Sequence, residues 1–227
     1  MRINRYLASA GLCSRRKAET YINEGLVTIN GTVAKLGDRV EEGDRVELEG
    51  KLIEPETRNV TLAYHKPVGV ECTADPSTEN NIISVLEYPL RLFTVGRLDK
   101  DSEGLILLTN DGDFCYKLSK ASEEHEKEYL VTLNKPYSAG FLRRMASGVE
   151  ILDTVTAPCK VERVSERSFK IVLVQGLNRQ IRRMCEALGY RVTSLIRLRI
   201  DKLTLDGIPK GEYRELSPEE MKHFFHL

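Results

Sequence analysis

The longest aliphatic runs in the chain, such as Leu105-Ile106-Leu107-Leu108, hold only four residues. A membrane-spanning helix needs about 20 consecutive apolar residues, so no span is predicted. Turn-forming residues follow the run at positions 109–112, and the run therefore predicts a short buried strand. The chain has 227 residues, of which 41% are hydrophobic, enough for one large domain or two modest ones with a proper core.

Charge is balanced over the whole chain but not along it. The 34 Lys and Arg residues equal the 34 Asp and Glu residues, and a net charge of zero, taken alone, speaks against a nucleic-acid partner. Residues 1–20 nevertheless carry a net charge of +4 and residues 160–202 one of +7, whereas residues 38–56 carry −5. The zero is a cancellation, and we expect a polarised surface with two basic zones.

Cysteine and histidine usage predicts neither a disulfide framework nor a metal site. The five cysteines are widely spaced without a C-x-x-C pair, which indicates reduced thiols in the cytoplasm. Of the four histidines, only His223 and His226 lie close together, and no third ligand is near them. No apolar stretch follows Arg2 and Arg5, so no secretory signal is predicted.

The first 55 residues are predicted to form a small α/β module. Helical spacing of apolar residues indicates a first helix, carried by Ile3, Tyr6, Leu7 and Ala10. Ser14 is placed to cap a second helix, and 27–29 predicts a strand that turns at Asn30-Gly31. Residues 56–60 are expected to be a linker.

Residues 61–227 are predicted to form a larger domain of mixed α and β structure. Its expected strands are 60–65, 92–95, 105–109, 128–133, 168–175 and 192–205. Its expected helices are 113–119, 138–147, 178–188 and 218–226.

Three consecutive bases, Arg15, Arg16 and Lys17, occupy the first turn of the second predicted helix. Cations at this positive end of the helix dipole cost about 0.3–1 kcal/mol each. A solvated face would tolerate that cost, but the neighbouring Arg2 and Arg5 favour a phosphate-binding surface.

In the C-terminal basic zone, one predicted helix and the strand after it carry five of the arginines: Arg179, Arg182, Arg183, Arg197 and Arg199. The first three follow Asn178, a predicted N-cap, and should project away from the apolar stripe of their helix. The last two alternate with apolar residues along a strand and should share one face. The pattern leaves open whether these are ordinary half-buried elements or a phosphate-binding surface.

The densest polar segment runs from residue 96 to 104. Its acids imitate the start of a calcium-binding loop, but Asn110 stands where a bidentate Glu is required, so calcium is not predicted. Arg97 beside Asp99 would favour an ionised carboxylate, which suits a nucleophile or a charge stabiliser. The pattern does not decide between that role and a carboxylate that only caps the loop.

This segment, Gly-Arg-Leu-Asp-Lys-Asp-Ser-Glu-Gly-Leu at 96–105, resembles the signature of the RsuA family of ribosomal RNA pseudouridine synthases, with its RluB, RluE and RluF branches. Other blocks of the family follow its order at 66–69 (Lys-Pro-Val-Gly), 127–129 (Lys-Glu-Tyr) and 176–184 (Gly-Leu-Asn-Arg-Gln-Ile-Arg-Arg-Met). Residues 1–50 resemble the S4 RNA-binding module. Residues 125–129 and 178–184 look closest to the RluF branch, which acts on large-subunit rRNA.

The resemblance implies an α+β fold in which a small S4-like domain precedes a larger, mainly antiparallel catalytic domain. It implies that the uridine N-glycosidic bond is broken, the uracil is rotated and C5 is joined to C1′, without a cofactor. Asp99 matches the catalytic Asp of the family, and Tyr129 matches the tyrosine that stacks on the flipped uracil. Arg182 matches the arginine that pairs with the catalytic Asp. The Lys66-Pro67 block is assigned no chemical role.

The implied partner is ribosomal RNA, expected to be 23S rRNA, with tRNA left open as a second substrate. We expect a cytoplasmic monomer that needs neither a metal nor a membrane. No basic extension follows Phe225, so RNA contacts from such an extension are not expected. The alternative is a non-catalytic S4-type RNA- or ribosome-binding protein, against which the intact Asp99 block speaks. The residues expected to bind RNA are Arg2, Arg5, Arg15, Arg16, Lys17, Arg97, Arg179, Arg183, Arg197 and Arg199.

Overall fold

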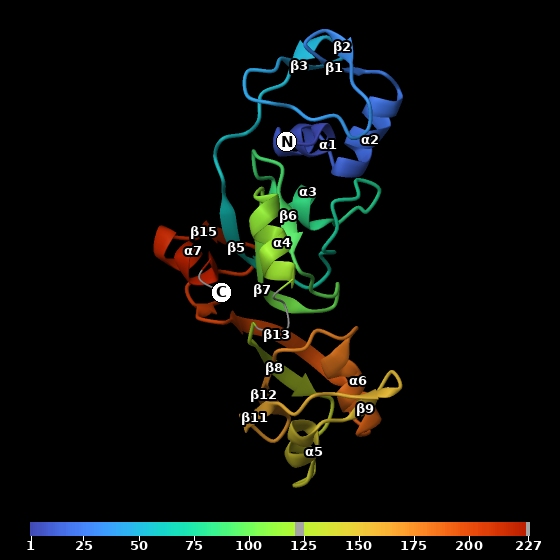
Figure 1. Cartoon of the computed structure of the whole chain (residues 1–227). Coiled ribbons are helices and arrows are strands. Elements are labelled where there is room, and N and C mark those ends of the chain that lie inside the picture. Colours follow the sequence, from blue (N-terminus) through green and yellow to red (C-terminus); the bar gives the residue numbers. More distant parts are fainter. Residues whose placement is uncertain (121–124, 226–227) are drawn as a thin grey trace. The chain divides into compact units, whose positions relative to one another are not determined.

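The computed structural model describes residues 1–120 and 125–225, which form two compact units (Figure 1). The first unit contains Met1–Val60 together with the short later segments Tyr88–Leu92 and Thr109–Gly112. The remaining described residues, from Thr61 onward, form the second unit. The expected α+β fold with mainly antiparallel sheets is confirmed.

The first unit packs two helices with a small antiparallel sheet. The helices are α1 (Ile3–Ser9) and α2 (Arg15–Asn23). Residues 1–60 form a four-stranded sheet in the order β2-β1-β3-β4, from β1 (Val27–Ile29), β2 (Thr32–Val33), β3 (Val46–Leu48) and β4 (Lys51–Leu52). The core of the unit joins both layers, with Ile3 and Leu7 from α1, Ile22 from α2 and Val27 and Val46 from the sheet.

Local signals in the sequence decide the ends of these elements. The Ser14 hydroxyl accepts a hydrogen bond from the Lys17 backbone N–H at 3.1 Å, so the predicted helix cap is confirmed. Asn30 and Gly31 both have positive φ angles, 51° and 79°, as a two-residue hairpin turn between β1 and β2 requires.

The described residues of the second unit contain a nine-stranded sheet in the order β11-β12-β8-β13-β7-β5-β15, with β14 paired to β13 and β6 to β7. β13 runs parallel to β7 but antiparallel to β8, and β8 is antiparallel to β12. The strand bounds are β5 Thr61–Lys66, β6 Phe93–Val95, β7 Glu103–Thr109, β8 Lys127–Leu133, β11 Lys160–Arg163, β12 Ser168–Leu173, β13 Val192–Ile200, β14 Leu203–Thr204 and β15 Tyr213–Glu215.

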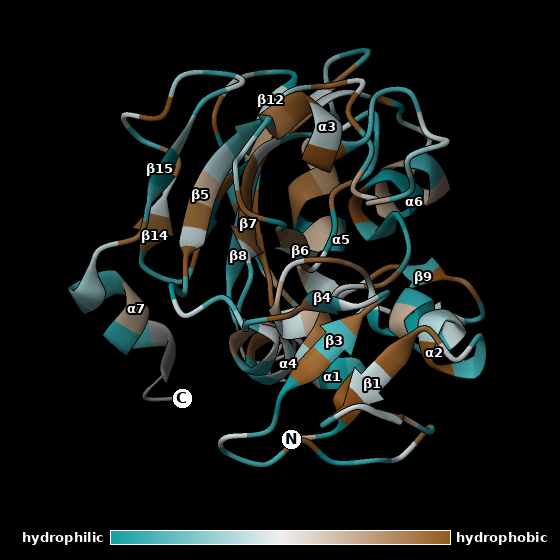
Figure 2. Cartoon of the chain, turned by 90° about the horizontal axis from the view of Figure 1, so that it is seen from above, coloured by the Kyte–Doolittle hydropathy of each residue, from teal (hydrophilic) through white to brown (hydrophobic). Residues whose placement is uncertain are grey.

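Five helices are seen between residues 82 and 225 in the described part of the chain: α3 (Ile82–Leu86), α4 (Gly112–Lys120), α5 (Phe141–Ser147), α6 (Gln180–Ala187) and α7 (Pro218–Phe225). Apolar side chains of α5 and α6 pack with those of β8, β12 and β13, whereas Phe114 and Leu118 of α4 pack with β5 and β7. Figure 2 shows the hydrophobic colour along β7, where Leu105–Leu108 are at most 1% exposed. The predicted buried strand is confirmed.

Several predicted bounds were wrong. The expected strand 192–205 ends at Ile200, and a turn at Asp201, which has a φ of 50°, sends β14 back along it. Asn178 does not cap α6, because the N-cap position belongs to Arg179. The prediction missed α3, β4, β11, β15 and the hairpin of β9 (Glu150–Ile151) and β10 (Thr154–Val155).

The predicted end of the last helix at His226 lies outside the described residues. No helix among the described residues is long and apolar enough to cross a membrane.

Candidate active site

The loop between β6 and β7 carries Asp99. Its backbone turns where the Ser102 N–H donates to the Asp99 carbonyl at 3.0 Å. Gly104, in β7, has a φ of 117°, and a Cβ at this position would lie 2.3 Å from the Arg197 carbonyl oxygen of β13. Only glycine fits between the two strands at this point, and this close approach fixes where the loop enters the sheet.

The Lys66-Pro67-Val68-Gly69 block packs beside this loop. The Gly69 N–H donates to the Lys100 carbonyl at 2.7 Å, and the Leu98 N–H donates to the Cys72 sulfur at 3.4 Å. Lys100 also bridges to Glu71, with its Nζ 2.8 Å from Glu71 Oε1. The segment that follows β5 therefore holds the backbone on both sides of Asp99.

Lys66 is fully buried in β5. Its Nζ donates to the carbonyls of Pro67 and Val70, at 2.9 and 2.8 Å. Burial lowers the pKa of the Lys66 ammonium, whereas attraction by Cys72, Asp101 and Asp99 opposes that shift. A buried cation thus lies beneath the segment that packs against the acidic loop. This burial was not predictable from the sequence, because nothing in the residues around a single lysine indicates it.

Two arginines at the start of α6 clamp the loop from the other side. The Arg179 guanidinium binds both carboxylate oxygens of Asp101, at 3.1 and 2.9 Å, and its Nη1 lies 3.3 Å from Asp99 Oδ2. The Arg179 hydrogen bonds hold the pKa of the Asp101 carboxyl below its usual value. The Asp99 side chain stays 35% exposed, so its carboxylate remains accessible to a substrate.

Arg182 lies one helical turn further along α6. Its Nη2 donates to the Asp101 carbonyl at 2.7 Å and to the Ser102 hydroxyl at 3.2 Å, and its Nε is 3.4 Å from Asp101 Oδ2. Among the described residues, the ion pair with Asp99 therefore comes from Arg179. Arg182, which was expected to pair with Asp99, binds Asp101 and Ser102 further along the loop.

Tyr129 lies on β8 in register with Arg197 of β13, which pairs in turn with Gly104 of β7. Adjacent strands are about 4.8 Å apart, so the backbone of Tyr129 is about 10 Å from that of Gly104 along one row of the sheet. The tyrosine is partly buried against the apolar cluster beneath α5 and α6. Tyr129, the predicted stacking residue, therefore lies across the sheet from Gly104, which follows the Asp99 loop in the chain.

The two strand arginines lie differently from the sequence expectation. Arg197 is 4% exposed, and its Nε donates to the Leu105 carbonyl at 2.6 Å. Arg199 binds carboxylates of Glu128 and Glu126, each at 3.0 Å. The register of β13 against β8 shifts between the two arginines, which interrupts the predicted alternation. Arg197 is thus buried in the sheet, and Arg199 is paired with two carboxylates.

The other predicted RNA contacts have varied surroundings. All five in the first unit are exposed: Arg2, Arg5, Arg15, Arg16 and Lys17. Lys17 lies over the Tyr21 ring, 4.8 Å from its centroid. Arg97 is exposed, and Arg183 is half-buried with its guanidinium bonded to the Asn178 side chain at 3.1 Å.

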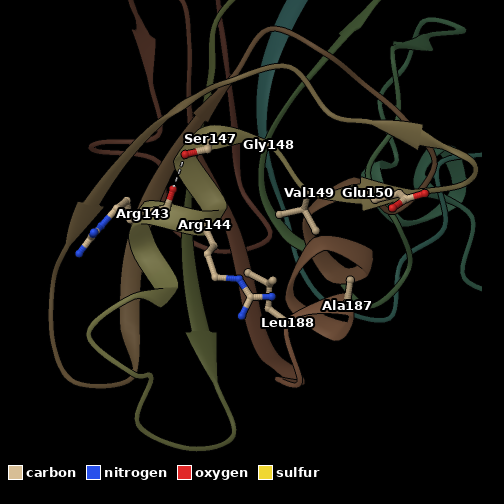
Figure 3. Close-up of a pocket in the computed structure, with 8 residues that line it drawn as sticks. All are labelled: Arg143, Arg144, Ser147, Gly148, Val149, Glu150, Ala187 and Leu188. Carbon is tan, nitrogen blue, oxygen red and sulfur yellow. Dashed lines mark hydrogen bonds between the residues drawn. The ribbon is translucent and has the colours of Figure 1, made fainter.

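A pocket of about 500 Å³ lies away from these residues (Figure 3). It is lined from α5, β9 and the end of α6, and Arg144 extends toward Leu188. A cation at the C-terminal end of a helix is favourable because the helix dipole is negative there. The pocket contains none of Asp99, Tyr129 and Arg182.

The arrangement around Asp99 supports chemistry that needs an ionised carboxylate. Cations surround the loop on two sides, with Lys66 buried and Arg179 partly exposed. In the described ranges, His, Cys, Asp and Glu side chains form no cluster that could hold a metal ion. Asp99 presents a partly exposed carboxylate, the type of group that can act as a nucleophile or stabilise a charge.

Two family models match the chain. The S4 domain model matches residues 1–46, and the RNA pseudouridylate synthase model matches residues 60–187, which include the Asp99 loop. The chain belongs to the RNA pseudouridine synthase family and is an enzyme of that family. The resemblance to this family found in the four ordered sequence blocks is confirmed.

Within the family, the chain is similar to proteins that modify RNA. It is 50% identical to the dual-specificity RNA pseudouridine synthase RluF of Salmonella typhi, over 100% of this chain and 79% of that protein. It is 37% identical to the ribosomal large subunit pseudouridine synthase B of Bacillus subtilis, over 97% of this chain and 94% of that protein. The crystal structure of a pseudouridylate synthase superposes with a TM-score of 0.71 at 30% identity, over 99% of both chains.

Proposed function

We propose that this enzyme isomerises specific uridines of 23S rRNA to pseudouridine, with Asp99 as the catalytic carboxylate. The observation that carries the proposal is the placement of Asp99: a partly exposed carboxylate in ion-pair contact with Arg179, on a loop held from both sides. The name of the large-subunit relative supports the large-subunit substrate. The RluF relative is named for a dual specificity, which supports a second RNA substrate, and we propose that this is a tRNA.

The reaction replaces one bond between the base and the ribose by another. The C1′–N1 bond breaks, the uracil rotates, a C1′–C5 bond forms, the C5 proton leaves and N1 gains a proton. The target base is stacked within RNA and must be flipped out before Asp99 can reach it. We propose that Tyr129 stacks on the flipped uracil, a contact worth about 1–3 kcal/mol. Arg182 supports the catalytic loop through Asp101 and Ser102.

RNA is proposed to contact both units. The exposed bases Arg2, Arg5, Arg15, Arg16 and Lys17 supply the S4 contribution, and Arg97 and Arg183 supply contacts in the second unit. These substrates imply action in the cytoplasm. We also propose a monomer, which light scattering at several concentrations would test. The alternative of a non-catalytic S4-type binding protein is not supported, because the chain belongs to an enzyme family.

Replacing Asp99 by Asn tests the proposal. The amide keeps the size of the side chain but lacks the charge, so product formation should stop while RNA affinity stays near that of the parent enzyme. The assay is release of tritium into water from RNA labelled at uridine C5, prepared from cells that lack the gene. Glu162→Gln, at an exposed carboxylate of β11, should keep full activity. Full activity of Asp99→Asn would refute the catalytic assignment.

The target RNA needs a separate experiment. Pseudouridines should be mapped in rRNA and tRNA from cells lacking this gene and from parental cells. A pseudouridine missing from 23S rRNA alone would support the large-subunit substrate, and a second one missing from a tRNA would support dual specificity. A missing site only in small-subunit rRNA would overturn the proposed substrate.

A further inference from the structure

Asp101 lies two residues after Asp99 and has a different environment. Both of its carboxylate oxygens bind the Arg179 guanidinium, and Arg182 approaches one of them at 3.4 Å. Asp99 offers only one oxygen to Arg179, at 3.3 Å. The geometry of a bidentate pair fixes a guanidinium in both position and plane. Asp101 therefore orients the same guanidinium that meets Asp99.

The backbone of Arg179 supports this description. Arg179 occupies the N-cap position of α6 with φ 50° and ψ 35°, a left-handed conformation, and its side chain makes no cap hydrogen bond. A residue other than glycine persists in this conformation only where its surroundings hold it there, and such strain concentrates at functional sites. The same residue makes the paired contacts to the loop.

The main chain of the loop is tied to the same helix. Arg182 donates to the Asp101 carbonyl at 2.7 Å and to the Ser102 hydroxyl at 3.2 Å. Arg179 at the N-cap and Arg182 in the first turn of α6 therefore bind one residue of the loop, through its carboxylate and its carbonyl. A shift of Asp101 would move the guanidinium of Arg179 relative to Asp99.

We propose that Asp101 is a positioning residue, which holds the Asp99 carboxylate in its reactive place through Arg179. Arg179 then binds the loop that carries Asp99. It is not an RNA phosphate ligand, although the sequence had suggested that role. The inference rests on the proposed catalytic role of Asp99. The two roles differ in kinetics, because loss of alignment lowers kcat whereas loss of a phosphate contact raises KM.

Kinetics of Asp101→Asn, Arg179→Gln and the double variant test the pair, with tritium release from C5-labelled RNA as the assay. Each single variant should lower kcat by about 10- to 100-fold, because misplacing a reacting group by about 1 Å costs this much. KM should stay within about twofold of the parent value. The double variant should be no slower than the worse single variant, because both changes break one interaction.

Arg179→Lys supplies the conservative comparison. Lysine keeps the positive charge but cannot make the bidentate contact, so kcat should recover only in part relative to Arg179→Gln. Glu186→Gln, an exposed position on the same helix, should match the parent enzyme in both kcat and KM. If Asp101→Asn does not fold, as its melting temperature would show, the two Arg179 variants still decide the question.

The outcomes separate this inference from the proposed function. An inactive Asp99→Asn with fully active Asp101→Asn and Arg179→Gln variants would overturn the inference alone. A rise in KM at unchanged kcat would also overturn it and would return Arg179 to the RNA contacts. Additive losses in the double variant would show that the two residues act separately. Full activity of Asp99→Asn would overturn the proposed function itself.

Discussion

At the scale of single residues, Gly104 is the position where the backbone leaves least room. A Cβ there would meet the Arg197 carbonyl oxygen at 2.3 Å and its backbone nitrogen at 2.5 Å, and φ is 117°. Strand β7 must move away from β13 to admit a methyl group, which would displace the end of the Asp99 loop. The glycine thus couples the packing of the sheet to the geometry of the site.

We expect Gly104→Ala to lower the free energy of unfolding by more than about 2 kcal/mol, because backbone strain and a backbone clash add. Urea denaturation followed by circular dichroism would measure it. The matched control is Gly207→Ala, where φ is also positive, at 76°, but the space is open. That change should cost only about 1–2 kcal/mol of left-handed strain. Equal losses in the two variants would contradict the close approach of β7 and β13.

At the scale of elements, β8 and β13 are joined by a charge pair as well as by their backbone ladder. Arg199 Nε lies 3.0 Å from Glu128 Oε2, and both side chains are less than a quarter exposed. Hydrogen bonding from Arg199 holds the pKa of Glu128 below its ordinary value of 4.5. Because the folded-state pKa is lowered, the stabilisation is present above pH 4.5 and is lost as pH falls through the folded value.

Glu128→Gln should therefore lower the free energy of unfolding by about 1 kcal/mol at neutral pH. The difference from the parent enzyme should shrink as the pH falls below about 4.5, because both chains are then neutral at this position. Thermal unfolding of both proteins at a series of pH values would measure this difference in stability. Glu162→Gln, on β11, should follow the parent curve. A difference that did not depend on pH would show that packing, and not charge, stabilises this strand pair.

At the scale of the whole molecule, the zero net charge conceals basic and acidic segments of the chain. In the first unit, Arg15, Arg16 and Lys17 are all exposed at the start of α2, where the helix dipole disfavours cations. Bound phosphates would relieve that electrostatic cost. The S4 unit should therefore contribute a salt-dependent part of RNA affinity, whereas the internally bonded Arg199 should contribute none.

The double change Arg15→Ala with Arg16→Ala should weaken RNA binding and flatten the plot of log Kd against log salt. Each lost phosphate contact should change the slope by about one. Filter binding at several salt concentrations would measure the slope. The control is Lys51→Ala, an exposed base within the acidic stretch of residues 38–56, which should leave the slope unchanged. An unaltered slope in the double variant would show that the two arginines are merely solvated.

Features that depend on near neighbours in the chain were predictable from the sequence. Ser14 caps α2 because its hydroxyl lies three residues before the Lys17 N–H. Asn30-Gly31 turns the first hairpin because these residues tolerate positive φ. The run Leu105–Leu108 is buried because a continuous aliphatic segment is stable only between two apolar layers. The ordered blocks likewise identified the family, and Asp99 lies in one of them.

The tertiary structure alone decided which charges meet. Arg179 and Asp101 are 78 residues apart in sequence, so no local pattern could show that they bind each other. The same holds for the burial of Lys66, and for Arg197, whose donor to the Leu105 carbonyl spans 92 residues. A charged residue in a sequence is expected to be solvated, and only its partners in the folded chain decide whether it faces RNA, supports a loop or is buried. The sequence thus determined the family and the loop that carries Asp99, while the sheet and α6 decided what surrounds it.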